Sequence, residues 1–88
     1  MFFSNVTEDE VKNLHSIVSS NVKFYRLKKG LSQLELSLTI GLRSSAFLGN
    51  AENNTNGKHF NIEHIYKISK ALEIDICEFF KPLTETPL

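Results

Sequence analysis

Apolar residues recur at intervals of three or four along the first third of the chain, a spacing that stacks side chains on one face of a helix. These positions are Val11, Leu14, Val18, Val22 and Tyr25. Thr7 and Glu10 have the form of a capping box at the start of this helix. Gly30 suits the left-handed position that ends it. Residues 19–21 are weak helix formers, so residues 7–29 form either one bent helix or two.

A second, shorter helix is predicted over about residues 32–39. Its apolar residues, Leu34, Leu36, Leu38 and Ile40, alternate with polar ones as in a strand. Ser32 and Glu35, however, form a second capping box, and Gly41 supplies a helix stop. These two features favour the helix over the strand.

A third short helix follows, with Ser44 or Ser45 as its cap and an end near Asn53. It would turn Phe47, Leu48 and Ala51 inward. The run from Asn53 to Lys58 consists of turn-forming residues and is expected to be an exposed loop.

Two more helices are predicted in the last third of the chain. Asn61 caps a fourth helix. Its apolar stripe consists of Ile62, Ile65, Ile68, Ala71 and Leu72. Asp75 caps a fifth helix, which runs from Ile76 to about Phe80 and is stopped by Pro82.

The composition is that of one globular domain, since the chain has 88 residues, of which 41% are hydrophobic and 23% charged. Cys77 is the single cysteine and cannot close an internal disulfide, which indicates a reducing compartment such as the cytoplasm. We expect Cys77 to be a small buried hydrophobe. No apolar run approaches the roughly 20 residues of a membrane span, so no membrane partner is expected.

Charge is unevenly distributed although the formal net charge is zero. Residues 1–20 carry a net −2, residues 21–70 a net +5 and residues 71–88 a net −3. A basic centre of this kind can present a positive face to nucleic acid. Ordinary solvated faces explain the same distribution equally well, and zero net charge by itself argues weakly against a nucleic-acid partner.

The sequence contains no catalytic constellation and no glycine-rich phosphate loop. His15, His59 and His64 lie in different predicted elements without the spacing of a metal site. We therefore expect no enzyme activity, no metal and no cofactor.

The order and spacing of several short motifs resemble the lambda-repressor-like, Cro-type helix-turn-helix family, also called XRE. The residues that carry the resemblance are Lys23-Phe24-Tyr25-Arg26, Gly30-Leu31-Ser32-Gln33, Gly41, Glu52, Ile68-Ser69-Lys70-Ala71-Leu72 and Asp75. It implies a compact all-α, five-helix domain over residues 17–81, after an N-terminal extension of residues 1–16 that is helical from about residue 7 and before a C-terminal tail of residues 82–88. It also implies sequence-specific binding of double-stranded DNA, with the helix near residues 44–53 in the major groove.

The resemblance also assigns roles to individual residues. Gln33 matches the family glutamine that binds a phosphate and steadies the recognition helix. Arg43 would bind phosphate or a guanine edge, and Lys58 would lie along the phosphate backbone. Asn50 is the best candidate for a base contact, through bidentate pairing with adenine. The outer face of the recognition helix would consist of Ser44, Ser45, Ala46, Gly49 and Asn50.

Arg26 and Glu52 match a semi-buried ion pair of the family, and we expect this pair to be structural. Between Gly41 and Glu52 the chain has one residue more than the commonest family spacing, so the register of the recognition helix is open by one residue. The loop from Asn53 to Phe60 is also longer and richer in asparagine than usual.

An aromatic cluster near the C-terminus has two interpretations. Phe79, Phe80 and Leu83 either form a homodimer interface or close the core of the monomer. A dimer would place two recognition helices about one turn of DNA apart.

The predicted function is that of a cytoplasmic transcription regulator, either a restriction-modification controller, a phage or mobile-element repressor, or a stand-alone regulator. The alternative is an antitoxin or adaptor module whose main partner is another protein. Weak base-reading residues on the third helix and the zero net charge favour that alternative.

Overall fold

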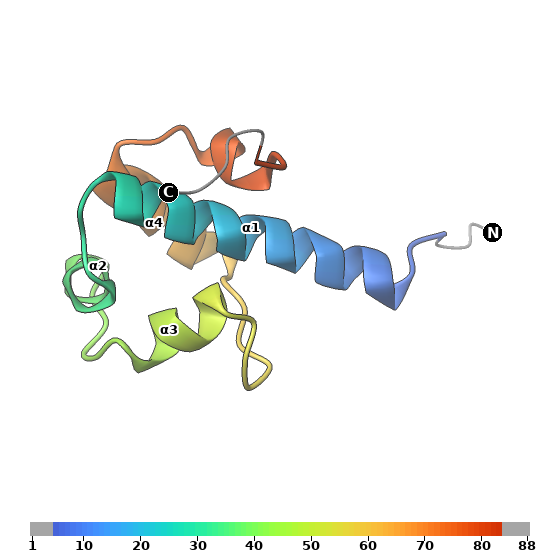
Figure 1. The fold of residues 1–88 in the computed structure, drawn as a ribbon, viewed down its shortest axis with the longest axis horizontal. Coiled ribbons are helices and arrows are strands. Elements are labelled where there is room, and N and C mark those ends of the chain that lie inside the picture. Colours follow the sequence, from blue (N-terminus) through green and yellow to red (C-terminus); the bar gives the residue numbers. More distant parts are fainter. Residues whose placement is uncertain (1–4, 84–88) are drawn as a thin grey trace.

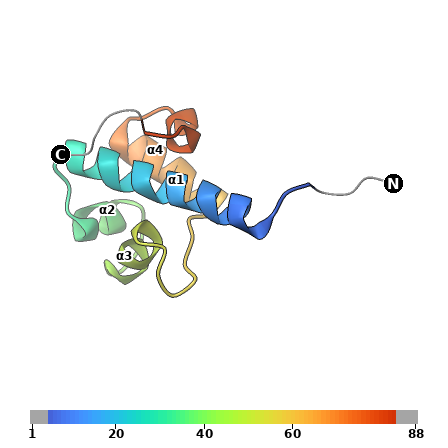
Figure 2. The same ribbon diagram turned by 45° about the vertical axis from the view of Figure 1, so that its right-hand side comes forward.

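The computed structural model describes residues 5–83 as an all-helical fold without a β-strand in that range. Its elements are α1 (Glu8–Lys28), α2 (Gln33–Thr39), α3 (Ala46–Glu52), α4 (Ile62–Leu72) and the 3-10 helix η1 (Ile76–Phe80). α2 and α3 lie on one side of α1, and η1 lies on the other (Figure 1). The turned view in Figure 2 shows the same division. The predicted all-α class is confirmed.

α1 is one continuous helix across the weak helix formers of residues 19–21. Two of these residues are buried and make long-range hydrogen bonds. The Ser19 hydroxyl donates to the Ala51 carbonyl at 2.7 Å, and the Asn21 amide donates to the carbonyls of Phe79 and Lys81 at 2.8 and 2.7 Å. The polar side chains therefore bond other segments instead of competing for their own backbone, and the helix continues.

The ends of α1 follow the sequence in part. The Thr7 hydroxyl accepts a hydrogen bond from the Glu10 backbone at 3.1 Å, which is one half of the predicted capping box. Gly30 has a φ of 75° and ends the helix. The next N–H, that of Leu31, returns to the Arg26 carbonyl at 3.1 Å, as in a Schellman motif.

α2 and α3 begin and end as expected. Ser32 and Glu35 form the complete capping box of α2, and Gly41 at a φ of 89° lies just beyond its end. Of the two predicted caps of α3, Ser45 occupies the N-cap position, but its side chain makes no capping hydrogen bond. The hydroxyl of Ser44, one residue earlier, accepts from the Ala46 backbone at 3.3 Å.

The fifth predicted helix is a 3-10 helix, so the described residues contain four α-helices and not five. Asp75 caps η1 as expected, accepting from the Cys77 backbone at 2.9 Å. Only five residues separate this cap from Lys81, and Pro82 restricts Lys81 to the extended conformation that is observed. So short a segment suits the tighter 3-10 geometry.

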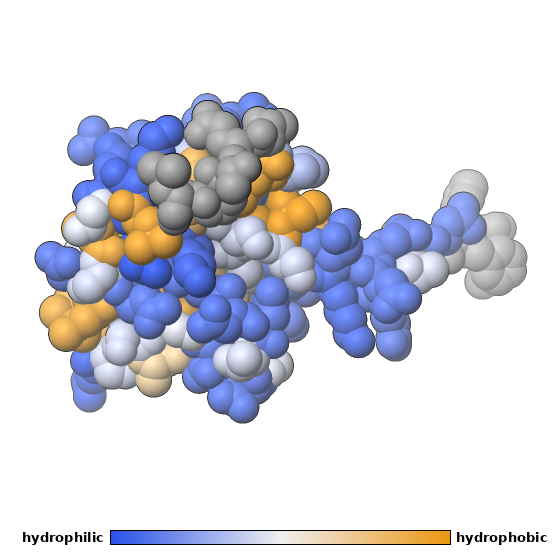
Figure 3. All heavy atoms as spheres, viewed as in Figure 1, coloured by the Kyte–Doolittle hydropathy of each residue, from blue (hydrophilic) through white to orange (hydrophobic). Residues whose placement is uncertain are grey.

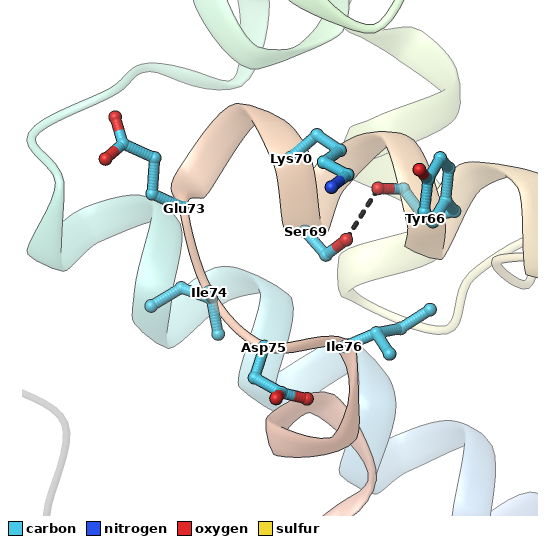
Figure 4. Close-up of a pocket in the computed structure, with 7 residues that line it drawn as sticks. All are labelled: Tyr66, Ser69, Lys70, Glu73, Ile74, Asp75 and Ile76. Carbon is cyan, nitrogen blue, oxygen red and sulfur yellow. Dashed lines mark hydrogen bonds between the residues drawn. The ribbon is translucent and has the colours of Figure 1, made fainter.

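The junction between α4 and η1 borders a shallow hollow of about 480 Å³ (Figure 4). Glu73 takes a left-handed conformation with a φ of 56° at the end of α4. Figure 4 places Lys70, Glu73 and Asp75 around the hollow, so charges of both signs line it. The junction of α4 and η1 lies on the opposite side of α1 from α3 (Figure 1).

The core joins all five elements and leaves some predicted core positions outside. The buried hydrophobic residues are Val18, Val22, Leu36, Ile40, Leu48, Ala51, Phe60, Ile65, Ile68, Leu72 and Phe79. Ile62 is 84% exposed, so the buried stripe of α4 begins one turn later than predicted. Cys77 is exposed, and the expectation that it is buried is wrong. The reason is that η1 turns Phe79, and not Cys77, toward the core.

The first turns of α1 extend beyond the rest of the fold (Figure 2). Val11 and Leu14, in this part of α1, belong to the predicted apolar stripe but are 45% and 46% exposed. The stripe is buried only from Val18 onward. Residues 1–4 of the predicted extension and 84–88 of the predicted tail lie outside the described residues. No helix among residues 5–83 combines the length and the apolarity that a membrane span requires.

Candidate nucleic-acid interface

α3 is held by its inner face and leaves its outer face to solvent. Leu48 and Ala51 are fully buried, and Phe47 is half-buried against the ring of Phe60. Ala46 is exposed, and Asn50 is half-buried. In Figure 3 the surface over the end of α3 and the loop that follows it is hydrophilic to neutral, with a pale, mildly hydrophobic area over the start of α3. This face can therefore meet a polar partner.

The charges near this face are favourable for an anionic partner. Arg43 before α3 and Lys58 after it are both exposed. Glu52 is the only carboxylate in the sequence between them. Its side chain is fully buried and paired with Arg26, so it presents no free negative charge.

The pair of Arg26 and Glu52 is bidentate. The Arg26 Nε donates to Glu52 Oε2 at 2.7 Å, and Nη2 donates to Oε1 at 3.0 Å. The remaining Nη1 donates to the Leu31 carbonyl at 2.7 Å. The pair ties the end of α1 to the end of α3, as the sequence predicts, and belongs to the framework behind the outer face.

Gln33 connects α2 with α3. Its Nε2 donates to Glu52 Oε1 at 3.2 Å, so the amide joins the buried ion pair. Its Oε1 lies 3.2 Å from where a Cβ at Gly49 would be. Gly49 is thus the contact point between α2 and α3, and the absence of a side chain at this position lets Gln33 approach.

The predicted surface residues differ in how they are placed. Ser45 is half-buried, and Ser44 is exposed but accepts a hydrogen bond from the start of α3. Asn50 uses its amide oxygen within the chain, accepting from Thr55 Oγ1 at 2.7 Å and from Asn56 Nδ2 at 3.0 Å. This contact with the loop was not predicted; the asparagine-rich run indicated a turn but not its partner.

The loop from Asn53 to Phe60 is attached to α1 at two points. Asn54 Oδ1 lies 3.1 Å from the Ser19 hydroxyl and shares its hydrogen with the nearer Ala51 carbonyl, and the Asn54 amide donates to Ser16 at 3.4 Å. The rings of His15 and His59 stack with centroids 3.8 Å apart. Burial, together with the nearby His59, lowers the pKa of His15. No spacing in the sequence indicates this pair, since 44 positions separate the two residues.

The predicted dimer residues do not share one environment. Phe79 is fully buried in the core and packs edge-on against the ring of Tyr25, so it is not available to a second chain. Phe80 is 47% exposed, and Leu83 is half-buried. Of the three predicted residues, Phe80 and Leu83 are therefore the two that could contribute to an interface at this position.

Comparison with known proteins shows which fold this is. The chain is similar to the restriction-modification controller protein C.AhdI from Aeromonas hydrophila, with 27% identity and a TM-score of 0.66 over 75% of this chain and 96% of that one. This chain carries a helix-turn-helix domain. The predicted resemblance is confirmed at that level, with α2 and α3 as the two helices of the motif.

The chain is also similar to a second solved structure, which supports the fold alone. The hypothetical transcription factor NHTF from Neisseria has 21% identity and a TM-score of 0.70, covering 93% of this chain and 88% of that one. No protein-family model matches the chain, and no curated protein matches it.

Proposed function

We propose that the chain binds double-stranded DNA in a sequence-specific manner and regulates transcription, with α3 in the major groove. The observation that carries the proposal is the charge arrangement of α3. Its one carboxylate, Glu52, is buried against Arg26, while Arg43 and Lys58 are exposed at the two ends. Exposed cations without a competing free carboxylate favour the neutralisation of phosphate charge, which provides the sequence-independent part of binding.

The proposed contacts divide between backbone and bases. Arg43 and Lys58 bind phosphates, and Ser45, Ala46 and Asn50 face base edges. Gln33 mainly positions the recognition helix, because its amide donates to Glu52 and so fixes α3 relative to α2.

A homodimer is part of the proposal. Phe80, which is 47% exposed, and Leu83 offer an apolar patch next to η1. Two copies related by a two-fold axis would bind half-sites about one turn of DNA apart. Sedimentation at micromolar concentration tests this: a dimer that Phe80→Ser dissociates supports it, and a monomer at every concentration refutes it.

One structural neighbour supports a regulatory role, since it is named as a restriction-modification controller protein and is 27% identical to this chain. The likeness spans nearly all of that protein and favours control of restriction and modification over the other two settings.

Selection of bound oligonucleotides from a random duplex pool tests the function directly. A recovered two-fold symmetric site is the expected result. Affinity for it should fall steeply with salt, and Lys58→Ala should reduce the slope of log K against log salt by about 1 per protomer. Lys81→Ala, on the opposite side of α1, is the matched control and should leave the slope unchanged. Failure to enrich any sequence, together with a salt-insensitive protein complex, would favour the second candidate, a module whose main partner is a protein.

A further inference from the structure

The loop after α3 completes the C-terminal end of that helix. The last carbonyls of a helix have no partner within it. Here the Asn53 side chain donates to the Gly49 carbonyl at 2.9 Å, and the Thr55 backbone donates to the Asn50 carbonyl at 2.9 Å. The Ala51 carbonyl accepts from Ser19 at 2.7 Å. Loop and helix therefore form one unit.

A tight turn fixes the tip of this loop. Asn56 and Gly57 have φ values of 54° and 64°, and the Lys58 N–H donates to the Thr55 carbonyl at 3.1 Å. Two successive left-handed residues with the sequence Asn-Gly define a type I′ turn. The turn holds Asn56 in a fixed position beside Asn50.

The turn saturates one half of the Asn50 amide. Asn50 Oδ1 accepts from Thr55 Oγ1 at 2.7 Å and from Asn56 Nδ2 at 3.0 Å. An amide oxygen has two lone pairs, so its capacity is filled. Within residues 5–83 the Asn50 Nδ2 group has no hydrogen-bond partner. The Asn50 side chain thus has two unpaired donor hydrogens and no free acceptor within the described residues.

A donor-only amide has a different base preference from a free one. Bidentate pairing with adenine needs an acceptor for the N6 amino group as well as a donor for N7. Guanine presents two acceptors, N7 and O6, side by side in the major groove, whereas cytosine presents an amino donor. Two hydrogens on one nitrogen match the guanine edge, and the occupied oxygen leaves the amino group of adenine unpaired.

We infer that Thr55 and Asn56 are specificity-determining positioning residues, which fill the Asn50 amide oxygen and so direct Asn50 to guanine instead of adenine. The inference rests on the proposed DNA-binding function. It replaces the adenine contact that the sequence suggested for Asn50, and it gives the asparagine-rich loop a part in base recognition without a direct base contact.

The test combines selection from a random duplex pool with three sets of variants. Asn50→Ala first identifies which base pair of the selected site depends on Asn50. The wild-type chain should prefer G·C over A·T there by on the order of tenfold. The double substitution Thr55→Val with Asn56→Gly keeps side-chain volume at residue 55 and the left-handed backbone at residue 56. It frees the oxygen and should shift that base pair toward A·T, with other positions unchanged.

Thr55→Ser is the matched control, because it keeps the hydroxyl donor and should keep G·C. Circular dichroism confirms that each variant is folded. A wild-type preference for A·T at this base pair overturns the inference even if the variants do not fold. Equal loss of affinity for every sequence in the double variant, with G·C retained, also overturns it, because the loop would then be merely structural. A wild-type chain that selects no sequence overturns the DNA-binding function itself, and the base preference with it.

Discussion

Replacing Arg26 with methionine separates the charge of this side chain from its bulk. The guanidinium makes two hydrogen bonds to Glu52, at 2.7 and 3.0 Å, and one to the Leu31 carbonyl at 2.7 Å. The side chains of the pair are 7% and 0% exposed. Without the arginine, Glu52 keeps only the 3.2 Å hydrogen bond from Gln33 and becomes a buried charge without a counterion.

The expected cost follows from that burial. Removing one partner of a buried ion pair costs about 3–5 kcal/mol, whereas an exposed pair contributes about 1 kcal/mol or less. A domain of this size loses about 4–8 °C of Tm per kcal/mol. Arg26→Met should therefore lower Tm by on the order of 20 °C, and urea unfolding followed by circular dichroism measures the free energy directly.

A double substitution distinguishes an unpaired charge from a simple loss of packing. Arg26→Met combined with Glu52→Leu removes both charges and should be more stable than Arg26→Met alone. A cost of about 1 kcal/mol or less for Arg26→Met would refute the buried character of the pair. So would a double variant whose cost equals the sum of the two single costs.

Three further changes are expected to alter stability. Ser37 has a buried hydroxyl without a hydrogen-bond partner within residues 5–83, so Ser37→Ala should raise the free energy of unfolding by about 1 kcal/mol; a loss in urea titration would contradict this. Glu73→Gly should stabilise by about 0.5–1 kcal/mol, because Glu73 is left-handed at a φ of 56° and is exposed; Glu73→Ala, equally strained, is the control and should show no such gain. The third change is in pH. Burial and the nearby His59 lower the pKa of His15 in the folded chain. As pH falls, His15 is therefore protonated in the unfolded chain before it is protonated in the folded one. The free energy of unfolding should decrease as pH drops below the ordinary histidine pKa of about 6.5. His15→Gln should flatten this part of a pH series of urea titrations, and an unchanged slope would rule out His15 as its source.

The local elements were largely predictable because their determinants are close in sequence. The capping box of Ser32 and Glu35 and the left-handed Gly41 are each specified within a few residues, and α2 lies where they place it. η1 was predicted with the right cap at Asp75 and the right end near Phe80 but as the wrong helix type, although the five residues between Asp75 and Lys81 suit the tighter 3-10 geometry.

Long-range partners were not predictable in the same way. Ser19 and Asn21 look like a helix interruption in sequence, yet each bonds a distant segment and stays in α1. The exposure of Val11 was missed for a related reason: periodicity predicts which residues share a face, but not whether another element covers that face. The resemblance gave the pair of Arg26 and Glu52, whereas nothing local linked Asn56 to Asn50.

The asparagine-rich loop helps to explain how a helix as short as α3 is ordered. Isolated helices below about 12–15 residues are marginal in water, and α3 has seven residues. It is held at its end by the pair of Glu52 and Arg26, at its middle by the contact of Gly49 with Gln33, and at its last carbonyls by the loop. Because these contacts exist within a single chain, ordering α3 costs nothing further when a partner binds. Preorganisation of this kind favours affinity, and it confines adjustment at the outer face to side chains such as Arg43 and Lys58, which are exposed at either end.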